Sequence, residues 1–228
     1  FLLFMKPQDL SPPFLWKERR PCIQDGVLYV PRHYFEHQNF STSYHQEFFQ
    51  NHTSIACELC SGNGDWVVAQ AQKDPQVLWI AVEQRFDRVR KIWSKMINHQ
   101  IQNLRIVCGT AETFFQYYVP DQFLQRLVVN FPDPWPKMRH RKHRLLQPSF
   151  VQEISRSLQD SAVFALATDD KTYLLESIEA LQTHLAPRME TPYYIKMTDT
   201  YGNSWFENLW RTKGQEIFYT EFIKKAGI

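Results

Sequence analysis

From residue 53 onward, short apolar runs alternate with stretches of helical periodicity, and this alternation restricts the possible folds more than any other feature. The apolar runs indicate buried strands at 53–59, 77–82, 104–108, 126–130 and 162–167. Helical spacing between them is clearest at Val89, Ile92, Trp93, Met96 and Ile97. Strands that alternate with helices predict an α/β fold with a mostly parallel central sheet covered by helices on both faces.

The two ends of the chain depart from this alternation. Residues 1–52 are rich in proline and aromatic residues, and they predict an irregular N-terminal extension that packs on a core domain of residues 53–228. Near the C-terminus, Asp169 and Asp170 suit the N-terminus of a helix whose apolar face is expected to extend to Leu185. Strands are then expected at 193–197 and 216–222, with a polar loop at 198–214 between them.

Charge and hydropathy exclude several classes of protein. The net charge of the 228 residues is only +2, so attraction to a polyanion must come from a local patch. No apolar run reaches the roughly 18 residues of a membrane-spanning helix. The apolar start, residues 1–5, is too short for a signal peptide. We therefore expect a cytoplasmic protein whose four cysteines are reduced.

Acidic residues and glycines follow the first two strands, at the edge of a parallel sheet where ligands bind. Glu58 precedes a Gly62-Asn-Gly64 turn, and Glu83 follows the second strand. Glycine lets the backbone approach a ligand closely, and Glu83 can accept hydrogen bonds from ribose hydroxyls. A dinucleotide site would need a glycine at position 67, where this chain has Val67. The pattern favours a cationic nucleoside such as S-adenosylmethionine, with a purely structural turn as the alternative.

The sequence does not favour a metal site. Cys57 and Cys60 have the spacing of a metal or redox pair, but no second such pair exists. Strand residues three apart also point to opposite faces. His140 and His143 lie within a run of cations that would compete with a metal, so they are interpreted as solvated or RNA-facing.

The segment 130–144 follows the fourth strand and combines a stiff acidic turn with a basic run. Prolines 132, 134 and 136 surround Asp133 and Trp135 and restrict the backbone. The basic run consists of Lys137, Arg139, His140, Arg141, Lys142, His143 and Arg144. A basic run alone is often a solvated loop, but the rigid turn before it favours a functional site.

The stretch Phe131-Pro-Asp-Pro-Trp-Pro-Lys137, with Arg139-His140 and Arg144 after it, resembles the signature of the tRNA (guanine-N7-)-methyltransferases of the bacterial TrmB type. Supporting stretches are 58–64, 82–83, 167–169 and 204–207, and the similarity covers about residues 53–224. The resemblance implies a Rossmann-like class I methyltransferase domain at 53–228. It also implies S-adenosylmethionine as donor and, as acceptor, a guanine of the tRNA variable loop (m7G46 type).

The same resemblance assigns roles to individual positions. Donor-binding roles are implied for Glu58, Gly62, Gly64, Glu83, Thr110 and Asp133, of which Asp133 is also the catalytic residue. Substrate-binding roles are implied for Lys137, Asp169, Ser204, Trp205, Phe206 and Glu207. RNA contacts are implied for Arg139, His140, Arg141, Lys142, His143 and Arg144. The expected partner is tRNA, with no membrane and no metal, for a monomer or a homodimer.

Three positions depart from the family pattern. Cys60 replaces a glycine, Thr110 replaces an aspartate that contacts the adenine amino group, and Ser204 replaces a threonine. The first two leave a second hypothesis, a catalytically impaired tRNA-binding protein of the same fold. A third hypothesis, an amino-group methyltransferase, fits the aspartate between prolines and the basic run poorly.

Overall fold

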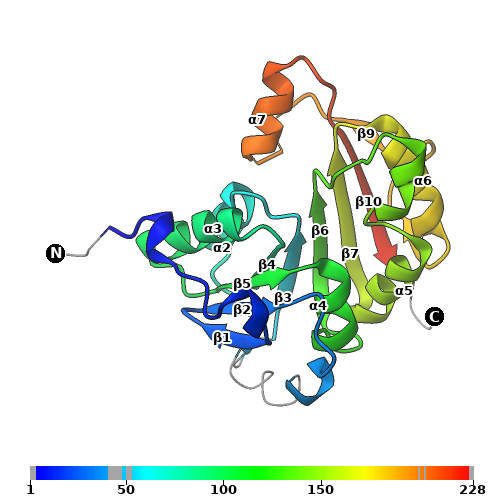
Figure 1. Cartoon of the computed structure of the whole chain (residues 1–228). Helices are drawn as coiled ribbons and strands as arrows, with labels where there is room; N and C mark the ends of the chain where they lie inside the picture. Colours follow the sequence, from blue (N-terminus) through cyan, green and yellow to red (C-terminus); the bar gives the residue numbers. More distant parts are fainter. Residues whose placement is uncertain (1–3, 41–47, 50–52, 200, 203, 226–228) are drawn as a thin grey trace. The chain divides into compact units, whose positions relative to one another are not determined.

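The protein is described by a computed structural model that covers residues 4–40, 48–49, 53–199, 201–202 and 204–225 (Figure 1). The chain divides into two compact units, Phe1–Val119 and Pro120–Ile228, each with strands and helices of its own. This arrangement confirms the predicted α/β class.

Unit 1 contains a largely parallel set of strands in the order β1-β2-β5-β4-β3. Its strands are β1 Cys22–Gln24, β2 Val27–Val30, β3 Ile55–Leu59, β4 Leu78–Glu83 and β5 Leu104–Gly109. Its α-helices are α2 Asp65–Lys73, α3 Phe86–Asn98 and α4 Ala111–Tyr118, and its 3-10 helices are η1 Pro7–Asp9 and η2 Trp16–Glu18. All residues of β3 and β4 are buried, as their apolar composition predicted.

Part of the N-terminal extension belongs to this sheet, which corrects the expectation that it is irregular. Strand β1 forms an antiparallel hairpin with β2, and β2 pairs in parallel with β5. Val30 lies opposite Gly109, where an added Cβ would stand 2.6 Å from the Val30 carbonyl oxygen. The glycine therefore permits a close approach that the run 27–30 alone did not predict. The boundary between residues 52 and 53 stays a prediction.

Unit 2 combines one parallel pair of strands with antiparallel ones. Its strands are β6 Leu124–Asn130, β7 Leu158–Thr168, β8 Leu185–Pro187, β9 Ile195–Lys196 and β10 Phe218–Lys224. Strand β6 pairs in parallel with β7, whereas β10 pairs antiparallel with β7, β8 and β9. Its helices are η3 Met138–His143, α5 Pro148–Ser157, α6 Lys171–Gln182 and α7 Trp205–Thr212, with α5 and α6 beside the strands in Figure 1.

Three expectations for unit 2 were wrong. Helix α6 ends at Gln182, and Leu185 instead begins β8, where it pairs with Lys224 of β10. Of residues 193–197, only 195–196 form a strand. The segment 198–214 was expected to be a loop but contains α7; its polar composition concealed a helix start at Ser204, whose side chain accepts a hydrogen bond from the Glu207 N–H. Residues 200 and 203 lie outside the described part.

Candidate functional site

In unit 1, the turn that follows β3 contains three residues with left-handed backbone conformations. The φ angles are 61° at Cys60, 55° at Gly62 and 80° at Gly64. Glycine adopts such angles readily, whereas other L-residues are strained by them. Cys60, the position where the sequence departs from the family's glycine, therefore has a backbone conformation that suits glycine.

Helix α3 packs against this turn and holds it. A Cβ added at Gly64 would lie 2.8 Å from a carbon of Ile92, so no larger residue fits there without a shift. Lys95 donates a hydrogen bond to the carbonyl oxygen of Asn63 at 2.8 Å and forms an ion pair with Asp65. The turn is thus fixed on its α3 side, and the structure explains the requirement for glycine at position 64.

Glu83, at the end of β4, ties the turn to the next strand. Its side chain is 3% exposed. One carboxylate oxygen accepts from the Gly62 N–H at 2.9 Å and the other from the Arg85 N–H at 2.8 Å. Burial raises the pKa of the Glu83 carboxyl, while the backbone hydrogen bonds and the Arg88 guanidinium, 3.7 Å away, lower it. A carboxylate has about four acceptor sites, so Glu83 can also accept from a ligand's hydroxyl groups.

The other donor-binding candidates of unit 1 lie in the segments beside Glu83. Glu58 is buried within β3. Glu83 lies opposite Cys108 in the parallel pairing of β4 with β5, and Thr110 follows β5 as the N-cap of α4. The Thr110 hydroxyl accepts from the Thr113 N–H at 3.4 Å and lies 2.9 Å from the Thr113 hydroxyl. Its oxygen is therefore partly occupied by the helix cap.

The cysteines of unit 1 are free thiols rather than a disulfide pair. Burial raises the pKa of both Cys57 and Cys60, and the nearby carboxylates add to the effect. A thiol with a raised pKa stays protonated at neutral pH and is a poor metal ligand or nucleophile. Within the described ranges, no group of three or more His, Cys, Asp or Glu residues is placed to hold a metal ion.

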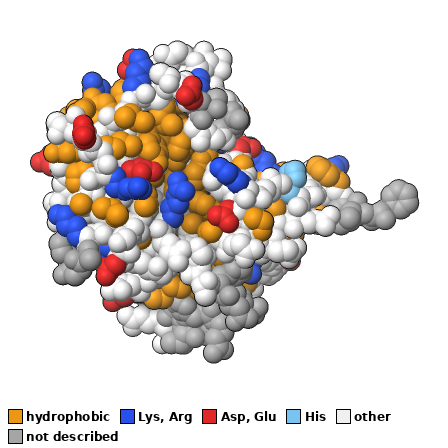
Figure 2. Space-filling model, turned by 180° about the vertical axis from the view of Figure 1, so that it is seen from behind, with side chains coloured by type: hydrophobic (Ala, Val, Ile, Leu, Met, Phe, Trp, Pro, Cys, Tyr) orange, Lys and Arg blue, Asp and Glu red, His pale blue; other side chains and the backbone are white. Residues whose placement is uncertain are grey.

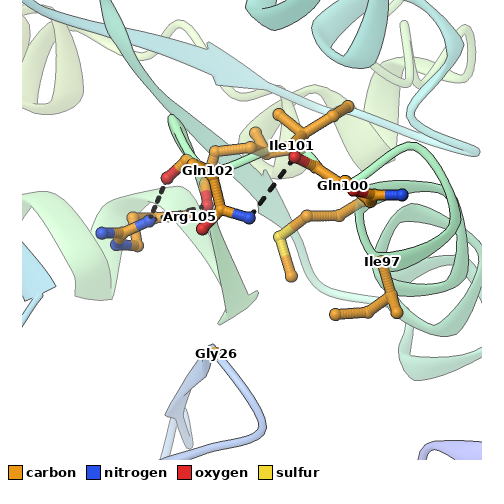
Figure 3. Close-up of a pocket in the computed structure, with 8 residues that line it drawn as sticks. Gly26, Ile97, Gln100, Ile101, Gln102 and Arg105 are labelled. Carbon is orange, nitrogen blue, oxygen red and sulfur yellow. Dashed lines mark hydrogen bonds between the residues drawn. The ribbon is translucent and has the colours of Figure 1, made fainter.

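Described residues of unit 1 line two cavities of similar size. The larger, of about 450 Å³, is lined by Gln84, Cys108 and Thr110 at the carboxyl ends of β4 and β5, and by residues of the N-terminal segment 12–32. The smaller, of about 330 Å³, lies near the amino end of β5, between Gly26, the last turn of α3 and the residues that follow it (Figure 3). Only the larger one lies at the edge of the sheet where the donor-binding candidates gather.

In unit 2, the Asp133 turn is held from within the same segment. One oxygen of the exposed Asp133 carboxylate accepts from the Trp135 N–H at 3.1 Å. Arg144 donates from Nε to the Pro134 carbonyl oxygen at 2.7 Å and from Nη2 to that of Trp135 at 3.5 Å. Arg144 is only 5% exposed and forms an ion pair with Glu176 of α6. Arg144 thereby fixes the turn to α6.

The basic run after this turn forms η3 and separates into outward and inward residues. Lys137, Arg139, Lys142 and His143 are exposed. Arg141 lies 3.1 Å from Glu176, and Arg144 is buried as described above. The Trp135 ring contacts His140 at 5.6 Å and His143 at 5.3 Å between ring centroids. The sequence contained no signal for this division, because it depends on Glu176 in another helix.

The segment 204–207 begins α7. Ser204 caps the helix by accepting from the Glu207 N–H at 3.1 Å. Glu207 is fully buried, and its carboxylate accepts from the N–H groups of Tyr201 and Gly202 and from Arg211. Phe206 is half-buried, whereas Trp205 is 49% exposed. Ser204 and Glu207 thus shape their own loop, and Trp205 presents its indole outward.

The start of α6 holds the last of the predicted site residues. Of the two acids expected at the helix N-terminus, Asp170 is the N-cap, because its side chain accepts a hydrogen bond from the Tyr173 N–H at 2.8 Å. Asp169 is half-buried, and this burial raises the pKa of its carboxyl group. Asp169 is therefore available for other interactions.

In the described part of the chain, no helix is long and apolar enough to cross a membrane.

Comparison with solved structures defines the class of the fold. The 16S rRNA methyltransferase KamB superposes with a TM-score of 0.62 at 12% identity, covering 82% of this chain and 94% of that one. An antibiotic-related methyltransferase gives a TM-score of 0.59 at 13% identity, covering 80% of this chain and 94% of that one. The protein therefore has the fold of class I S-adenosylmethionine-dependent methyltransferases.

Sequence comparison then defines the family. The family model described as "Putative methyltransferase" matches residues 52–220. The tRNA (guanine-N(7)-)-methyltransferase of Chlamydia abortus is 63% identical, covering 98% of this chain and 100% of that protein. The enzyme of the same name from Mannheimia succiniciproducens is 28% identical, covering 83% of this chain and 76% of that protein. The chain belongs to the tRNA (guanine-N(7)-)-methyltransferase family, as its motif predicted.

Proposed function

We propose that this protein transfers a methyl group from S-adenosylmethionine to N7 of a guanine in the variable loop of tRNA, the m7G46 type of modification, in the cytoplasm where tRNA is found. The observation that carries the proposal is the motif turn 131–137, in which Asp133 is held at the end of β6. The full-length likeness to the Chlamydia abortus enzyme supports the same reaction.

The donor is assigned to unit 1. Glu83 keeps free acceptor sites, and we assign it to bind the ribose hydroxyls of the donor. We assign the turn with Gly62 and Gly64 to bind the amino acid portion of the donor. The buried acid Glu58 suits a cationic ligand and disfavours a pyrophosphate. These groups fit S-adenosylmethionine, which supplies an electrophilic methyl group on its sulfonium when bound.

The chemistry requires positioning more than proton transfer. Guanine N7 carries an in-plane lone pair and no proton at neutral pH, so no strong base is needed. Holding N7 in line with the methyl group can supply roughly 7–11 kcal/mol. Methylation places positive charge on the purine, and a carboxylate nearby stabilises that charge. We assign this role to Asp133, whose fixed oxygen leaves the other to orient the base.

RNA contacts are assigned to outward side chains of unit 2. Lys137, Arg139 and Lys142 are exposed and can bind phosphates, and Lys137 can instead reach the O6 edge of guanine. N7 faces the deep groove of A-form RNA, so the guanine must lie in an irregular region or leave its stack. The exposed indole of Trp205 suits stacking on a base. Asp169 and Phe206 remain substrate-binding candidates, whereas Ser204 and Glu207 act by shaping the loop.

Unmodified tRNA incubated with radiolabelled S-adenosylmethionine tests the proposal, with the labelled atom mapped afterwards. The expected result is label on N7 of a variable-loop guanine, and none in a tRNA that lacks this guanine. The alternative of an impaired tRNA-binding protein arises only from the sequence departures at Cys60 and Thr110. Binding of tRNA without label transfer would support that alternative. Label on an exocyclic amino group would instead indicate an amino-group methyltransferase.

A further inference from the structure

The cavity of about 450 Å³ in unit 1 has two walls of different origin. One wall consists of residues directly after β4 and β5, namely Gln84, Gly109 and Thr110. The other lining residues come from the N-terminal segment and include Phe14, Arg19, Tyr29 and Arg32. Both sets of residues belong to the same compact unit, and the cavity begins one residue after Glu83.

Aromatic rings form a continuous row along this cavity. The Phe14 ring meets the Tyr29 ring edge-on, with centroids 5.8 Å apart, and Tyr29 lies 6.3 Å from Phe86. Tyr29 is buried, and its hydroxyl has no hydrogen-bond partner among the described residues. Phe14 and Phe86 are half-buried and keep part of their rings accessible. The row therefore offers an apolar lining with accessible ring surface at Phe14 and Phe86 and one buried hydroxyl at Tyr29.

The segment that carries Phe14 is anchored on both sides. Before it, Leu10 is buried and its carbonyl oxygen accepts from Arg90 Nε at 2.8 Å. Beyond it, the chain enters the β1–β2 hairpin, which is joined to β5. A wall that is already held in place loses little entropy when a ligand binds.

We propose that the N-terminal segment 12–32 is part of the donor site and that Phe14 supplies a surface on which the adenine ring lies. The inference rests on the proposed function, because it takes the ribose to be held by Glu83. A base attached to that ribose reaches the space lined by Gln84 and Thr110, which Phe14 also lines. Stacking of adenine on an aromatic ring compensates for the hydrogen bond that an aspartate at position 110 would make to the adenine amino group.

Binding of S-adenosylhomocysteine and of adenosine to the full chain, measured by titration calorimetry, tests this assignment. Phe14→Ala should lower the affinity for both ligands about tenfold, which is the lower end of the range for losing one stacked base. Phe14→Tyr keeps the ring and should bind like the wild type. Leu15→Ala is the matched control, because Leu15 is the neighbouring residue and is 73% exposed. The affinity of Phe14→Ala for tRNA should stay unchanged.

The outcomes separate this inference from the proposed function. If the wild type does not bind S-adenosylhomocysteine, the proposed function fails. If the wild type binds and Phe14→Ala binds equally well, only the role of Phe14 is overturned. An equal loss in Leu15→Ala, or a loss in Phe14→Tyr as large as in Phe14→Ala, would also overturn it, since either would indicate a general disturbance of the segment.

Discussion

Each unit holds a turn in place with a buried charged side chain, but the two charges have opposite signs. In unit 1, the Glu83 carboxylate accepts hydrogen bonds from the N–H groups of Gly62 and Arg85. In unit 2, the Arg144 guanidinium donates to the carbonyl oxygens of Pro134 and Trp135. Both side chains are nearly inaccessible to water, and each has a partner of the opposite charge, Arg88 and Glu176.

The residues of the turns explain the difference in sign. A turn with glycines presents backbone N–H groups, from which a carboxylate can accept hydrogen bonds. Proline has no N–H, so the turn with prolines 132, 134 and 136 offers mainly carbonyl oxygens. Arginine presents several donors in a rigid fork and can hold two carbonyls at once. Acidic and basic residues that look like ligand contacts in the sequence thus also stabilise the backbone.

The largest effect is expected at Asp133, which the proline turn holds in place. Asp133→Ala should lower turnover about 10²- to 10³-fold, the usual result of losing one charge-stabilising group. Affinity for tRNA should stay almost the same, because the exposed carboxylate does not attract phosphates. Single-turnover rates and filter binding measure the two quantities. Near-normal turnover would refute the catalytic role assigned to Asp133.

Arg144→Ala should lower the free energy of unfolding by about 2–3 kcal/mol, because the Pro134 carbonyl and Glu176 lose their buried partner. Urea denaturation measures this loss. The matched control is Arg139→Ala, which removes an exposed cation of the same run and should leave stability unchanged.

The salt dependence of tRNA binding separates the same two arginines. Arg139→Ala should reduce the slope of log affinity against log salt by roughly 0.7–0.9, the contribution of one phosphate contact. Arg144→Ala should leave that slope unchanged. A reduced slope for Arg144→Ala would mean that Arg144 contacts phosphate and is not a partner of the turn.

Glu83 should make the stability of the ligand-free protein depend on pH. Burial raises the pKa of Glu83 above its usual value of about 4.3, so the folded state binds this proton more tightly than the unfolded state. The contribution of Glu83 to the free energy of unfolding is therefore most favourable below pH 4 and declines as pH rises through the weakly acidic range. Denaturation of the wild type and of Glu83→Gln across that range should show a difference that changes with pH. A constant difference would contradict the raised pKa.

The smallest effect is expected at Cys60. Cys60→Gly should raise the free energy of unfolding by about 0.5–1 kcal/mol, because the left-handed strain of roughly 1–2 kcal/mol exceeds the entropy that glycine adds to the unfolded chain. Cys60→Ala keeps the strain and should give no gain. Thermal denaturation of the two variants compares them directly. Equal melting temperatures would show that the turn of unit 1 holds Cys60 without strain.

Local sequence patterns predicted the main strands and the motif. The run 77–82 predicted β4 because a continuous apolar composition requires burial on both faces of a strand. The proline motif identified the family because its residues are contiguous. By contrast, β2 is a run of only four residues near prolines, and its place beside β5 depends on Gly109, far away in the sequence.

The sequence by itself determined the α/β class, the restricted backbone of the proline turn around Asp133 and the membership of the tRNA (guanine-N(7)-)-methyltransferase family, since each follows from neighbouring residues. Only the tertiary structure decided which charged residues face inward. Arg139 and Arg144 are alike in the sequence, yet one is exposed and the other binds Pro134 and Glu176. The same holds for the N-terminal wall at Phe14, because a contact between distant segments leaves no periodic trace in either one.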